Sequence, residues 1–333
     1  MQPVRSATIF GCLGPHLSRA EASFFAEVDP VGFILFARNV DTPEQVVRLT
    51  GALRDAVGWQ APIFVDQEGG RVQRLRAPQW REWMPPLDQV MAAGPDRAAR
   101  SMYLRSLLIG REHLALGIDG NCAPCADIAR ADTHPFLRNR CYGEDLATVV
   151  ENSRAVAEGL ADAGVFPVVK HLPGHGLATR DSHHDLPQVT ASRGELEKTD
   201  FAAFRALNDL NWGMSAHLVF EEIDADAPAT LSLAMIQVIR EEIGFDGLLM
   251  TDDLSMNALP GGIAARAAGA IAAGCDVVLH CNGKPEEMAE VAAAAGRLGE
   301  AASKRLERAL GRRRAPVDMT DDAALAELNA LLM

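Results

Sequence analysis

The sequence predicts an α/β protein built as a single (β/α)₈ TIM barrel, because short apolar runs alternate along the chain with segments of helical periodicity. Such alternation requires a parallel sheet, and eight repeats in about 280 residues match a closed barrel. A doubly wound sheet usually has fewer strands and a glycine fingerprint after the first, which Gly11-Cys12-Leu13-Gly14 does not match. The expected strands are Ala7 to Phe10, Gly32 to Phe36, Pro62 to Val65, Gly120 to Ala123, Val165 to Val169, Trp212 to Ser215, Gly247 to Met250 and Asp276 to Leu279.

Helix starts are marked by residue pairs with capping-box spacing, in which the first side chain caps the helix and a Glu or Gln three residues later bonds back to it. These pairs are Ser18 with Glu21, Thr42 with Gln45, and Ser192 with Glu195. We expect one domain over residues 1–333, with the barrel at about 5–283 and C-terminal helices at about 284–333. Those helices are predicted as two, broken at Pro316, with the basic run from Lys304 to Arg314 forming a solvated helix end.

Composition excludes several classes of partner. The chain has 333 residues, 48% of them hydrophobic, and a formal net charge of −13, so it repels phosphate backbones and anionic lipid. We therefore expect no nucleic-acid partner and no membrane partner. The six cysteines lie mostly within or beside strand-like runs, and the apolar run at the N-terminus is too short for a signal peptide. Together these observations indicate a cytoplasmic protein with reduced thiols. Cys122 and Cys125 have a redox spacing, but no thioredoxin-like helix follows them, so a structural role is favoured.

The segment from Lys170 to Asp185 is predicted to be a catalytic loop, because it is rich in titratable groups and follows a buried strand. Asp181 lies two residues before His183, close enough in a turn to orient the imidazole and stabilise its protonated form, so this pair is a candidate general acid and base. The rival interpretation is a metal site, which we disfavour because Pro173-Gly174 prevents a shared helical face. Its ligands would come from His171, His175, His183, His184, Asp181 and Asp185. We expect no metal and no cofactor.

Two acids, Asp252 and Asp253, directly follow the predicted strand from Gly247 to Met250. Successive strand residues point to opposite sides, so we expect only one of the two carboxylates to face the barrel axis. A carboxylate in that place can attack an electrophilic carbon, whereas the alternative role is a helix N-cap. We predict that Asp252 is the nucleophile and that Asp253 is structural.

Polar residues also follow other predicted strands, and the carboxyl ends of barrel strands converge on one face. Asp66 could accept hydrogen bonds from two vicinal hydroxyls, and Arg74 could reach the same ligand or form a lone exposed ion pair. Arg140 lies in the loop after the fourth strand and on its own would count as a surface residue. The other residues expected in the pocket are Lys170 and His171, after the fifth strand, and His217, after the sixth.

These motifs together resemble glycoside hydrolase family 3, and more narrowly its bacterial cytoplasmic β-N-acetylglucosaminidase branch. The motifs are Lys170-His171 with Pro173-Gly174-His175-Gly176, Asp181-Ser182-His183, Asp66-Gln67-Glu68-Gly69-Gly70-Arg71-Val72-Gln73-Arg74 and Asp252-Asp253-Leu254-Ser255-Met256, and the resemblance covers nearly the whole chain. It implies Asp252 as nucleophile, His183 as acid/base and Asp181 as the residue that polarises it. The sugar-binding residues that it implies are Asp66, Arg74, Arg140, Lys170 and His171. The chain departs from the branch at Leu137, where glycine is more usual, close to the arginine expected to touch the sugar.

The activity implied by the resemblance is that of a retaining exo-β-N-acetylglucosaminidase (β-N-acetylhexosaminidase), acting on peptidoglycan-derived muropeptides of the GlcNAc-1,6-anhydro-MurNAc type through a covalent glycosyl-enzyme. The residues themselves indicate a carbohydrate-sized pocket with a nucleophile and an acid. The alternatives are a family 3 β-glucosidase and a non-catalytic sugar-binding barrel. A neutral His183 brings no negative charge to the second step, so phosphate is a candidate acceptor beside water. Met256 and Leu254 are candidates for a dry patch under an acetamido methyl, with core packing as the alternative.

Overall fold

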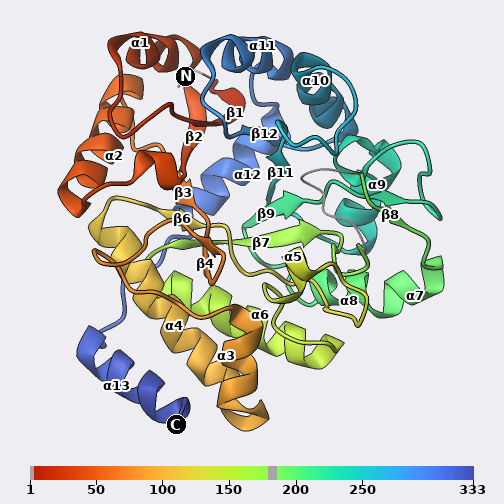
Figure 1. Ribbon diagram of the computed structural model, residues 1–333. Coiled ribbons are helices and arrows are strands. Elements are labelled where there is room, and N and C mark those ends of the chain that lie inside the picture. Colours follow the sequence, from red (N-terminus) through yellow and green to blue (C-terminus); the bar gives the residue numbers. More distant parts are fainter. Residues whose placement is uncertain (1–3, 179–185) are drawn as a thin grey trace.

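The computed structural model describes residues 4–178 and 186–333 and contains a closed barrel of parallel strands (Figure 1). The strand order around the barrel is β1-β12-β11-β9-β7-β6-β3-β2, and each strand overlaps one of the eight apolar runs. The predicted (β/α)₈ barrel is therefore confirmed. Its strands are β1 (Ser6–Gly11), β2 (Pro30–Leu35), β3 (Ile63–Val65), β6 (Gly120–Asn121), β7 (Phe166–Leu172), β9 (Trp212–Ser215), β11 (Leu248–Asp253) and β12 (Val277–His280).

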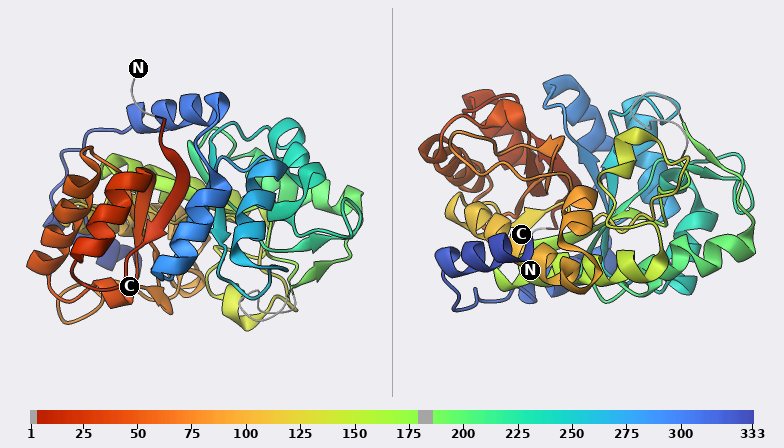
Figure 2. Two further views of the ribbon diagram at one scale, coloured as in Figure 1. Left: turned by 90° about the horizontal axis from the view of Figure 1, so that it is seen from above. Right: turned by 60° about the horizontal axis from the view of Figure 1, so that its bottom comes forward.

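Helices pack around the outside of the barrel, as two further views show (Figure 2). They are α1 (Arg19–Val28), α2 (Pro43–Val57), α3 (Pro86–Ala93), α4 (Pro95–Ala115), α5 (Pro135–Arg138), α6 (Leu146–Asp162), α7 (Arg193–Lys198), α8 (Asp200–Arg205), α9 (Leu233–Gln237), α10 (Ile263–Ala273), α11 (Pro285–Ala295), α12 (Glu300–Gly311) and α13 (Asp321–Leu331). Short 3₁₀ segments are η1 (Ala37–Asn39) and η2 (Ala229–Leu231), and η3 (Val238–Glu242) is a π-helix. Outside the barrel lie the antiparallel hairpin β4 (Gln67–Gly69) with β5 (Val72–Gln73) and the parallel pair β8 (Gln188–Val189) with β10 (Val219–Phe220). None of the described helices is both long enough and apolar enough to cross a membrane.

The three predicted helix starts are correct, but the capping boxes are only partly formed. Ser18 and Glu21 make the full reciprocal box at the start of α1. Thr42 accepts the Gln45 N–H at the start of α2, while the Gln45 side chain bonds the loops before the helix instead of returning to Thr42. Ser192 precedes α7, but its side chain makes no capping bond among the described residues. Spacing therefore located the helices better than it located their hydrogen bonds.

Aromatic rings fill part of the barrel interior. The centroid of the Trp212 ring lies 5.0 Å from that of Phe64 and 5.6 Å from that of Phe166, so residues of β9, β3 and β7 interlock across the barrel. Gly120 makes room for this packing, because a Cβ at that position would overlap the Phe64 ring. The interior of the barrel is thus a packed core, so polar functional residues are expected at the ends of the barrel.

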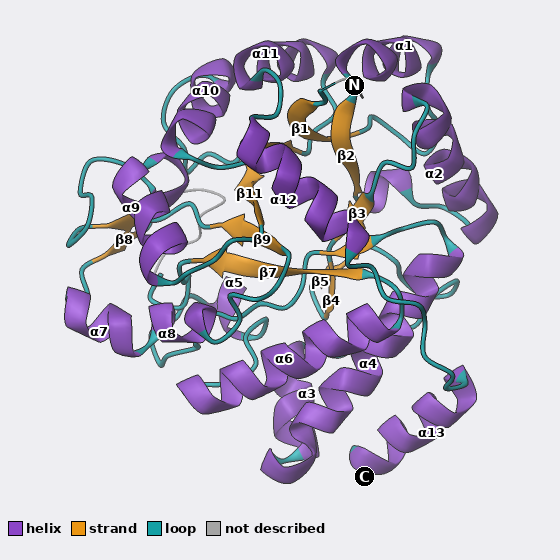
Figure 3. Cartoon of the chain, turned by 180° about the vertical axis from the view of Figure 1, so that it is seen from behind, coloured by secondary structure: helices purple, strands orange, loops and turns teal. Residues whose placement is uncertain are grey.

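The amino-terminal mouth of the barrel is covered by α12, which crosses it in the view from behind (Figure 3). Arg305 of α12 contacts Asp246 at 3.0 Å and Asp276 at 2.9 Å, and Arg313 just after the helix contacts Asp119 at 2.7 Å. Asp276 and Asp119 directly precede β12 and β6, and Asp246 lies two residues before β11. The basic run is exposed at Lys304, Arg312 and Arg314, as predicted for a solvated helix end, but Arg305 and Arg313 also pair with acids at the strand starts.

The segment after β12 forms three helices, so the prediction of two is wrong. Pro316 does separate α12 from α13, but a second break falls at Gly296, whose φ of +67° ends α11. Helix α11 packs against α10 and β1, and α13 packs against α4 (Figure 1). The helix following the eighth strand thus completes the ring around the barrel.

Candidate active site

A pocket of about 210 Å³ opens at the carboxyl ends of the barrel strands, the end opposite to α12. It is lined by residues from strand ends and the loops that follow them, which are far apart in the sequence. Among them are Asp66, Arg74, Arg140, Lys170, His171 and Asp252. The structure therefore brings these six predicted site residues together, whereas His217, which was also expected in the pocket, does not line it.

Lys170 and His171 lie within β7, although the sequence analysis placed them after the strand. Both side chains line the pocket, which a regular strand would not permit, because neighbouring side chains alternate between its faces. The register of β7 against β9 shifts between Val169 and Leu172. This irregularity of the ladder accounts for two consecutive residues facing one cavity.

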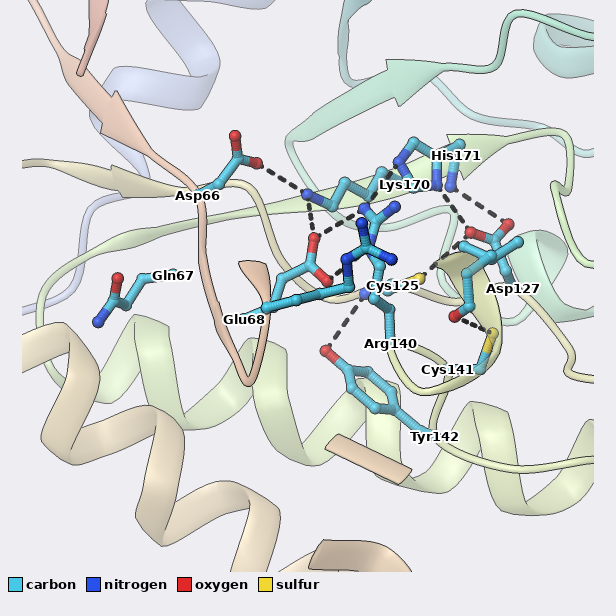
Figure 4. A network of polar contacts seen from close by, with 12 residues as sticks. Asp66, Gln67, Glu68, Cys125, Asp127, Arg140, Cys141, Tyr142, Lys170 and His171 are labelled. Carbon is cyan, nitrogen blue, oxygen red and sulfur yellow. Dashed lines mark hydrogen bonds and ion pairs between the residues drawn. The ribbon is translucent and has the colours of Figure 1, made fainter. Parts of the chain in front are cut away.

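A network of ion pairs forms one wall of the pocket (Figure 4). The Lys170 Nζ lies 2.9 Å from Asp66 Oδ1 and 2.6 Å from Glu68 Oε1. Arg74 contacts Asp66 at 3.1 Å, so the Asp66 carboxylate lies between two cations. Burial alone would raise the pKa of Asp66, but Lys170 and Arg74 outweigh it and hold that pKa well below its ordinary value. Asp66 is therefore an ionised acceptor on the pocket wall, and its pair with Arg74 belongs to a network.

Arg140 is buried, with 6% of its surface exposed, so the view that it would count as a surface residue is wrong. Its Nε and Nη2 each donate to Glu68 at 2.9 Å, which is a two-bond ion pair inside the protein. The Arg140 guanidinium also lies 5.2 Å from the ring centroid of Phe136. A buried carboxylate and an aromatic ring thus hold this arginine at the pocket.

The β4–β5 hairpin positions the acids and Arg74 of this wall. The Gln67 side-chain oxygen accepts the N–H groups of Arg74 at 2.8 Å and Leu75 at 3.1 Å. The Gln67 N–H in turn donates to Asn121 of β6 at 3.0 Å, which ties the hairpin to the barrel. Gly69 has a φ of +107°, and a Cβ there would overlap the Arg105 guanidinium, so the turn requires glycine.

Asp252 and Asp253 both contribute to the pocket lining, although only one of the two carboxylates was expected to face the barrel axis. The register of β11 against β12 shifts between Met250 and Asp253, which breaks the alternation on which that expectation depended. The Asp253 carboxylate is occupied by a turn: it accepts the Ser255 N–H at 3.0 Å, the Ser255 hydroxyl at 2.6 Å and the Cys281 N–H at 3.2 Å. Asp253 therefore has a structural place, although as a turn residue and not as a helix cap.

The Asp252 carboxylate accepts the Asp253 N–H at 2.8 Å through Oδ1. Burial raises its pKa, but the His217 and His171 rings and this backbone bond outweigh burial and lower it, which favours the ionised form. His217 was expected in the pocket itself and lies behind it instead. Its Nε2 is 3.1 Å from the Asp253 carbonyl and its Nδ1 is 2.9 Å from the Thr230 hydroxyl.

His171 is held by a buried acid, Asp127, which lies 2.7 Å from its Nδ1 (Figure 4). Asp127 also accepts the His175 N–H at 2.6 Å. Burial raises the pKa of Asp127, but His171 outweighs it and the pKa lies well below its ordinary value. Burial, reinforced by the charge of His171, lowers the pKa of His175 to about 3. The Asp127 bond fixes the His171 ring so that its Nε2 faces Arg140, 3.4 Å away, and the pocket.

Cys125, Asp127 and His171 offer three ligand atoms within 4.8 Å of one another, a set that transition metals bind in other proteins. Here the same atoms bond each other, because the Cys125 thiol donates to Asp127 at 3.2 Å. A hydrogen bond with Cys141 and burial raise the pKa of the Cys125 thiol well above its ordinary value, so it stays protonated. The cluster fits a hydrogen-bond network better than a metal site. Cys122 is also a buried free thiol, as the structural interpretation of the cysteine pair expects.

The predicted acid/base residue His183 and its partner Asp181 lie outside the described residues, and so do His184 and Asp185. Their roles stay predictions from the sequence.

Sequence reasoning gave no role to Glu68 or Asp127, the two buried acids behind the pocket. Glu68 stands two residues after Asp66 in the same motif, so a role for it was within reach of the sequence. Asp66 directly follows β3, whereas Asp127 lies six residues after the end of β6, so the strand-end rule points to Asp127 less directly. Their cationic and imidazole partners are distant in the sequence, since Arg140 lies 72 residues from Glu68 and His171 lies 44 residues from Asp127.

An apolar side of the pocket was also incompletely predicted. Phe36, Phe136, Met214 and Met256 contribute to the pocket lining. Met256 therefore suits the proposed dry patch, whereas Leu254 is fully buried in the hydrophobic core, as its alternative role expected.

Comparisons with known proteins agree with this geometry. Residues 11–312 match the glycosyl hydrolase family 3 N-terminal domain. A beta-hexosaminidase of Alkalilimnicola ehrlichii is 38% identical over 283 residues, which are 82% of this chain and 80% of that protein. A family 3 beta-N-acetylglucosaminidase from Paenibacillus sp. str. FPU-7 superposes with a TM-score of 0.86 at 31% identity, over 98% of this chain and 66% of that longer one. NagZ from Neisseria gonorrhoeae, crystallised with N-trifluoroacetyl-D-glucosamine, superposes with a TM-score of 0.84 at 28% identity, over 99% and 96% of the two chains.

Proposed function

This chain belongs to glycoside hydrolase family 3 and is a β-hexosaminidase, and we propose that it removes terminal N-acetylglucosamine from muropeptides as a retaining exo-enzyme with Asp252 as its nucleophile. The observation that carries the proposal is the Asp252 carboxylate, held at the end of β11 on the wall of a pocket that Asp66 and Lys170 also line. The described residues that line this pocket lie between Ile34 and Cys281 of the chain.

In the first step, an Asp252 oxygen attacks the anomeric carbon and the bond from that carbon to the aglycone oxygen breaks. The Asp253 N–H holds Asp252 Oδ1, so Oδ2 is the oxygen left for attack. His183 gives its proton to the departing oxygen. In the second step, His183 takes a proton from water, the water oxygen bonds the anomeric carbon, and Asp252 leaves as a carboxylate.

The ion-pair wall supplies groups that match sugar hydroxyls. Asp66 presents an ionised acceptor, while Lys170 and Arg140 keep N–H donors beyond those used in their ion pairs. Once these groups are buried by a ligand, a missing or inverted hydroxyl leaves one of them unpaired at a cost of about 1–3 kcal/mol. Such a wall supports recognition of one terminal sugar ring.

Selection of N-acetylglucosamine over glucose rests on the acetamido group. Met256 and Met214 offer an apolar surface for its methyl, which a glucoside lacks. The Neisseria neighbour was crystallised with an N-acylated glucosamine, which supports the same choice. The muropeptide aglycone is proposed from the family resemblance, and a cytoplasmic location is supported by six buried free thiols, which suit a reducing compartment.

Two measurements test this function. A chromogenic N-acetylglucosaminide should be cleaved with a kcat/KM well over tenfold above that of the matching glucoside; a glucoside preference would favour a β-glucosidase, and cleavage of neither would favour a sugar-binding barrel. A slow-turnover fluorinated N-acetylglucosaminide should label the proteolytic peptide that carries Asp252. Label on Asp253, or an unlabelled protein, would remove the nucleophile assignment.

Phosphate is a proposed second acceptor in the deglycosylation step, since a histidine base repels an anion less than a carboxylate base would. Raising phosphate through the millimolar range should divert part of the product to the sugar 1-phosphate. Product analysis that finds free sugar alone across the titration would count against this acceptor.

A further inference from the structure

Glu68 lies directly behind the pocket and does not form part of its lining. It belongs to β4, its side chain is fully buried, and both of its carboxylate oxygens bind cations that do line the pocket. Oε2 accepts from Arg140 Nε at 2.9 Å, and Oε1 accepts from Arg140 Nη2 at 2.9 Å and from Lys170 at 2.6 Å. Figure 4 shows the Glu68 carboxylate between Lys170 and Arg140, the two cations that line the pocket.

The geometry determines which donors remain for a ligand. A guanidinium has five N–H groups, and Glu68 occupies the Nε edge of Arg140, so the Nη1 group is left to turn toward the cavity. A protonated lysine has three donors, and Asp66 and Glu68 take two of those of Lys170. Lys170 therefore keeps one N–H, and Arg140 keeps the two N–H groups of Nη1, for sugar hydroxyls.

Glu68 also balances charge in a buried site. Lys170 and Arg140 are like charges that share this one carboxylate, and each is nearly inaccessible to solvent. Burial raises the pKa of Glu68, but Arg140 and Lys170 outweigh it and lower that pKa to about 2. Burial lowers the pKa of Lys170, but Asp66 and Glu68 raise it above its ordinary value. The titratable and charged groups that act on Lys170 are Asp66, Glu68, Arg140, Cys122 and, across the pocket, Asp252.

We propose that Glu68 is a positioning residue for sugar recognition: it holds Arg140 and Lys170 in their orientations through its two carboxylate oxygens, without touching the sugar. The proposal rests on the proposed function, because the cations act on the substrate of that function. It assigns to the second acid of the Asp66-Gln67-Glu68 motif a role distinct from that of the first, which lines the pocket.

The test is Glu68→Gln, which keeps the side-chain shape and removes its charge. The amide oxygen can serve one cation, while the amide NH₂ group faces the other and cannot accept from it. We expect kcat/KM at pH 7 for the N-acetylglucosaminide to fall at least tenfold, with the rise in KM exceeding the fall in kcat. We also expect kcat/KM of the variant to fall at alkaline pH where that of the wild type does not. Lys170 loses one of its two carboxylate partners, while its burial and the neighbouring Arg140 charge, which both lower its pKa, remain.

The matched control is Asp276→Asn, since Asp276 is also a buried carboxylate between two cations but lies at the opposite end of the barrel. It should keep the wild-type KM and pH profile. A Glu68→Gln enzyme whose kcat/KM stays within twofold of wild type, or falls by the same factor at every pH, would overturn the proposal.

A double-mutant cycle separates positioning from general damage. If Glu68 acts through Lys170, then Glu68→Gln should cost much less in a Lys170→Met background than in the wild type, and additive losses would contradict that route. Failure of the proposed function gives a different result, since the wild-type protein itself would then leave the N-acetylglucosaminide intact.

Discussion

The two ends of the barrel carry the same kind of ion-pair arrangement. At the amino end, Asp276 contacts arginines from η3 and α12 at 2.6 and 2.9 Å. At the carboxyl end, Asp66 contacts Lys170 and Arg74 at 2.9 and 3.1 Å. Judged by charge and distance alone, neither carboxylate could be identified as belonging to a functional site.

The difference lies in what remains after the internal bonds are made. Asp276 gives one oxygen to Arg305 and the other to Arg240 and the Leu249 N–H, and it does not line the pocket at the other end of the barrel. Asp66 has one contact on each oxygen and lines the pocket, so it keeps lone pairs for a ligand. Spare hydrogen-bonding capacity toward a cavity therefore distinguishes a binding wall from a structural network.

The largest effect should come from Asp252, which lines the pocket without belonging to either network. Asp252→Ala should lower kcat by a factor on the order of 10⁴ or more, because it removes the group that bonds the anomeric carbon. Azide should restore part of the turnover and give the α-glycosyl azide, which chromatography of the product would detect. Residual activity within a hundredfold of wild type would contradict the assignment.

His183→Ala should have the next largest effect and should depend on the leaving group. Loss of a general acid typically costs about 10²–10⁴-fold, so cleavage of a disaccharide should fall by that range. Glycosylation by a substrate with an activated phenol needs no protonation and should be nearly unchanged, as burst kinetics would measure. Equal losses on both substrates would indicate a structural histidine.

Asp66→Ala tests the carboxyl-end network directly. Removing this acceptor should cost about 1–3 kcal/mol of transition-state binding, or roughly ten- to a hundredfold in kcat/KM. The loss should apply to the N-acetylglucosaminide and the glucoside alike, because the hydroxyls that Asp66 would bind are common to both sugars. A loss confined to one of the two substrates would mean that Asp66 reads the 2-substituent instead.

Asp276→Asn should have the smallest effect on catalysis and a clear one on stability. It leaves the half-buried Arg240 without its charged partner, so the free energy of unfolding should fall by about 1–3 kcal/mol. Urea unfolding would measure this loss, and kcat/KM should stay within twofold of wild type. A large loss of activity in the folded variant would erase the distinction between the two ends of the barrel.

Much of the fold could be predicted because its signals are local. Each barrel strand is a short apolar run, and the strand-end rule located Asp66 and Asp252 without knowledge of their neighbours. The burial of Arg140 could not be predicted in that way, because its partner Glu68 is 72 residues away. The shared orientation of Asp252 and Asp253 likewise depends on the register with β12, which no property of β11 itself determines.

The α12 helix has a consequence for how the chain is made. Its contacts reach far back along the sequence, and the Arg313 pair with Asp119 spans 194 residues. A nascent chain can form most of the βα units before these arginines have been synthesised, but the aspartates at the strand starts then have no cations to meet. Contacts over such distances form slowly. We therefore expect the unfinished barrel to depend most on chaperones in the interval between synthesis of its last strand and docking of α12.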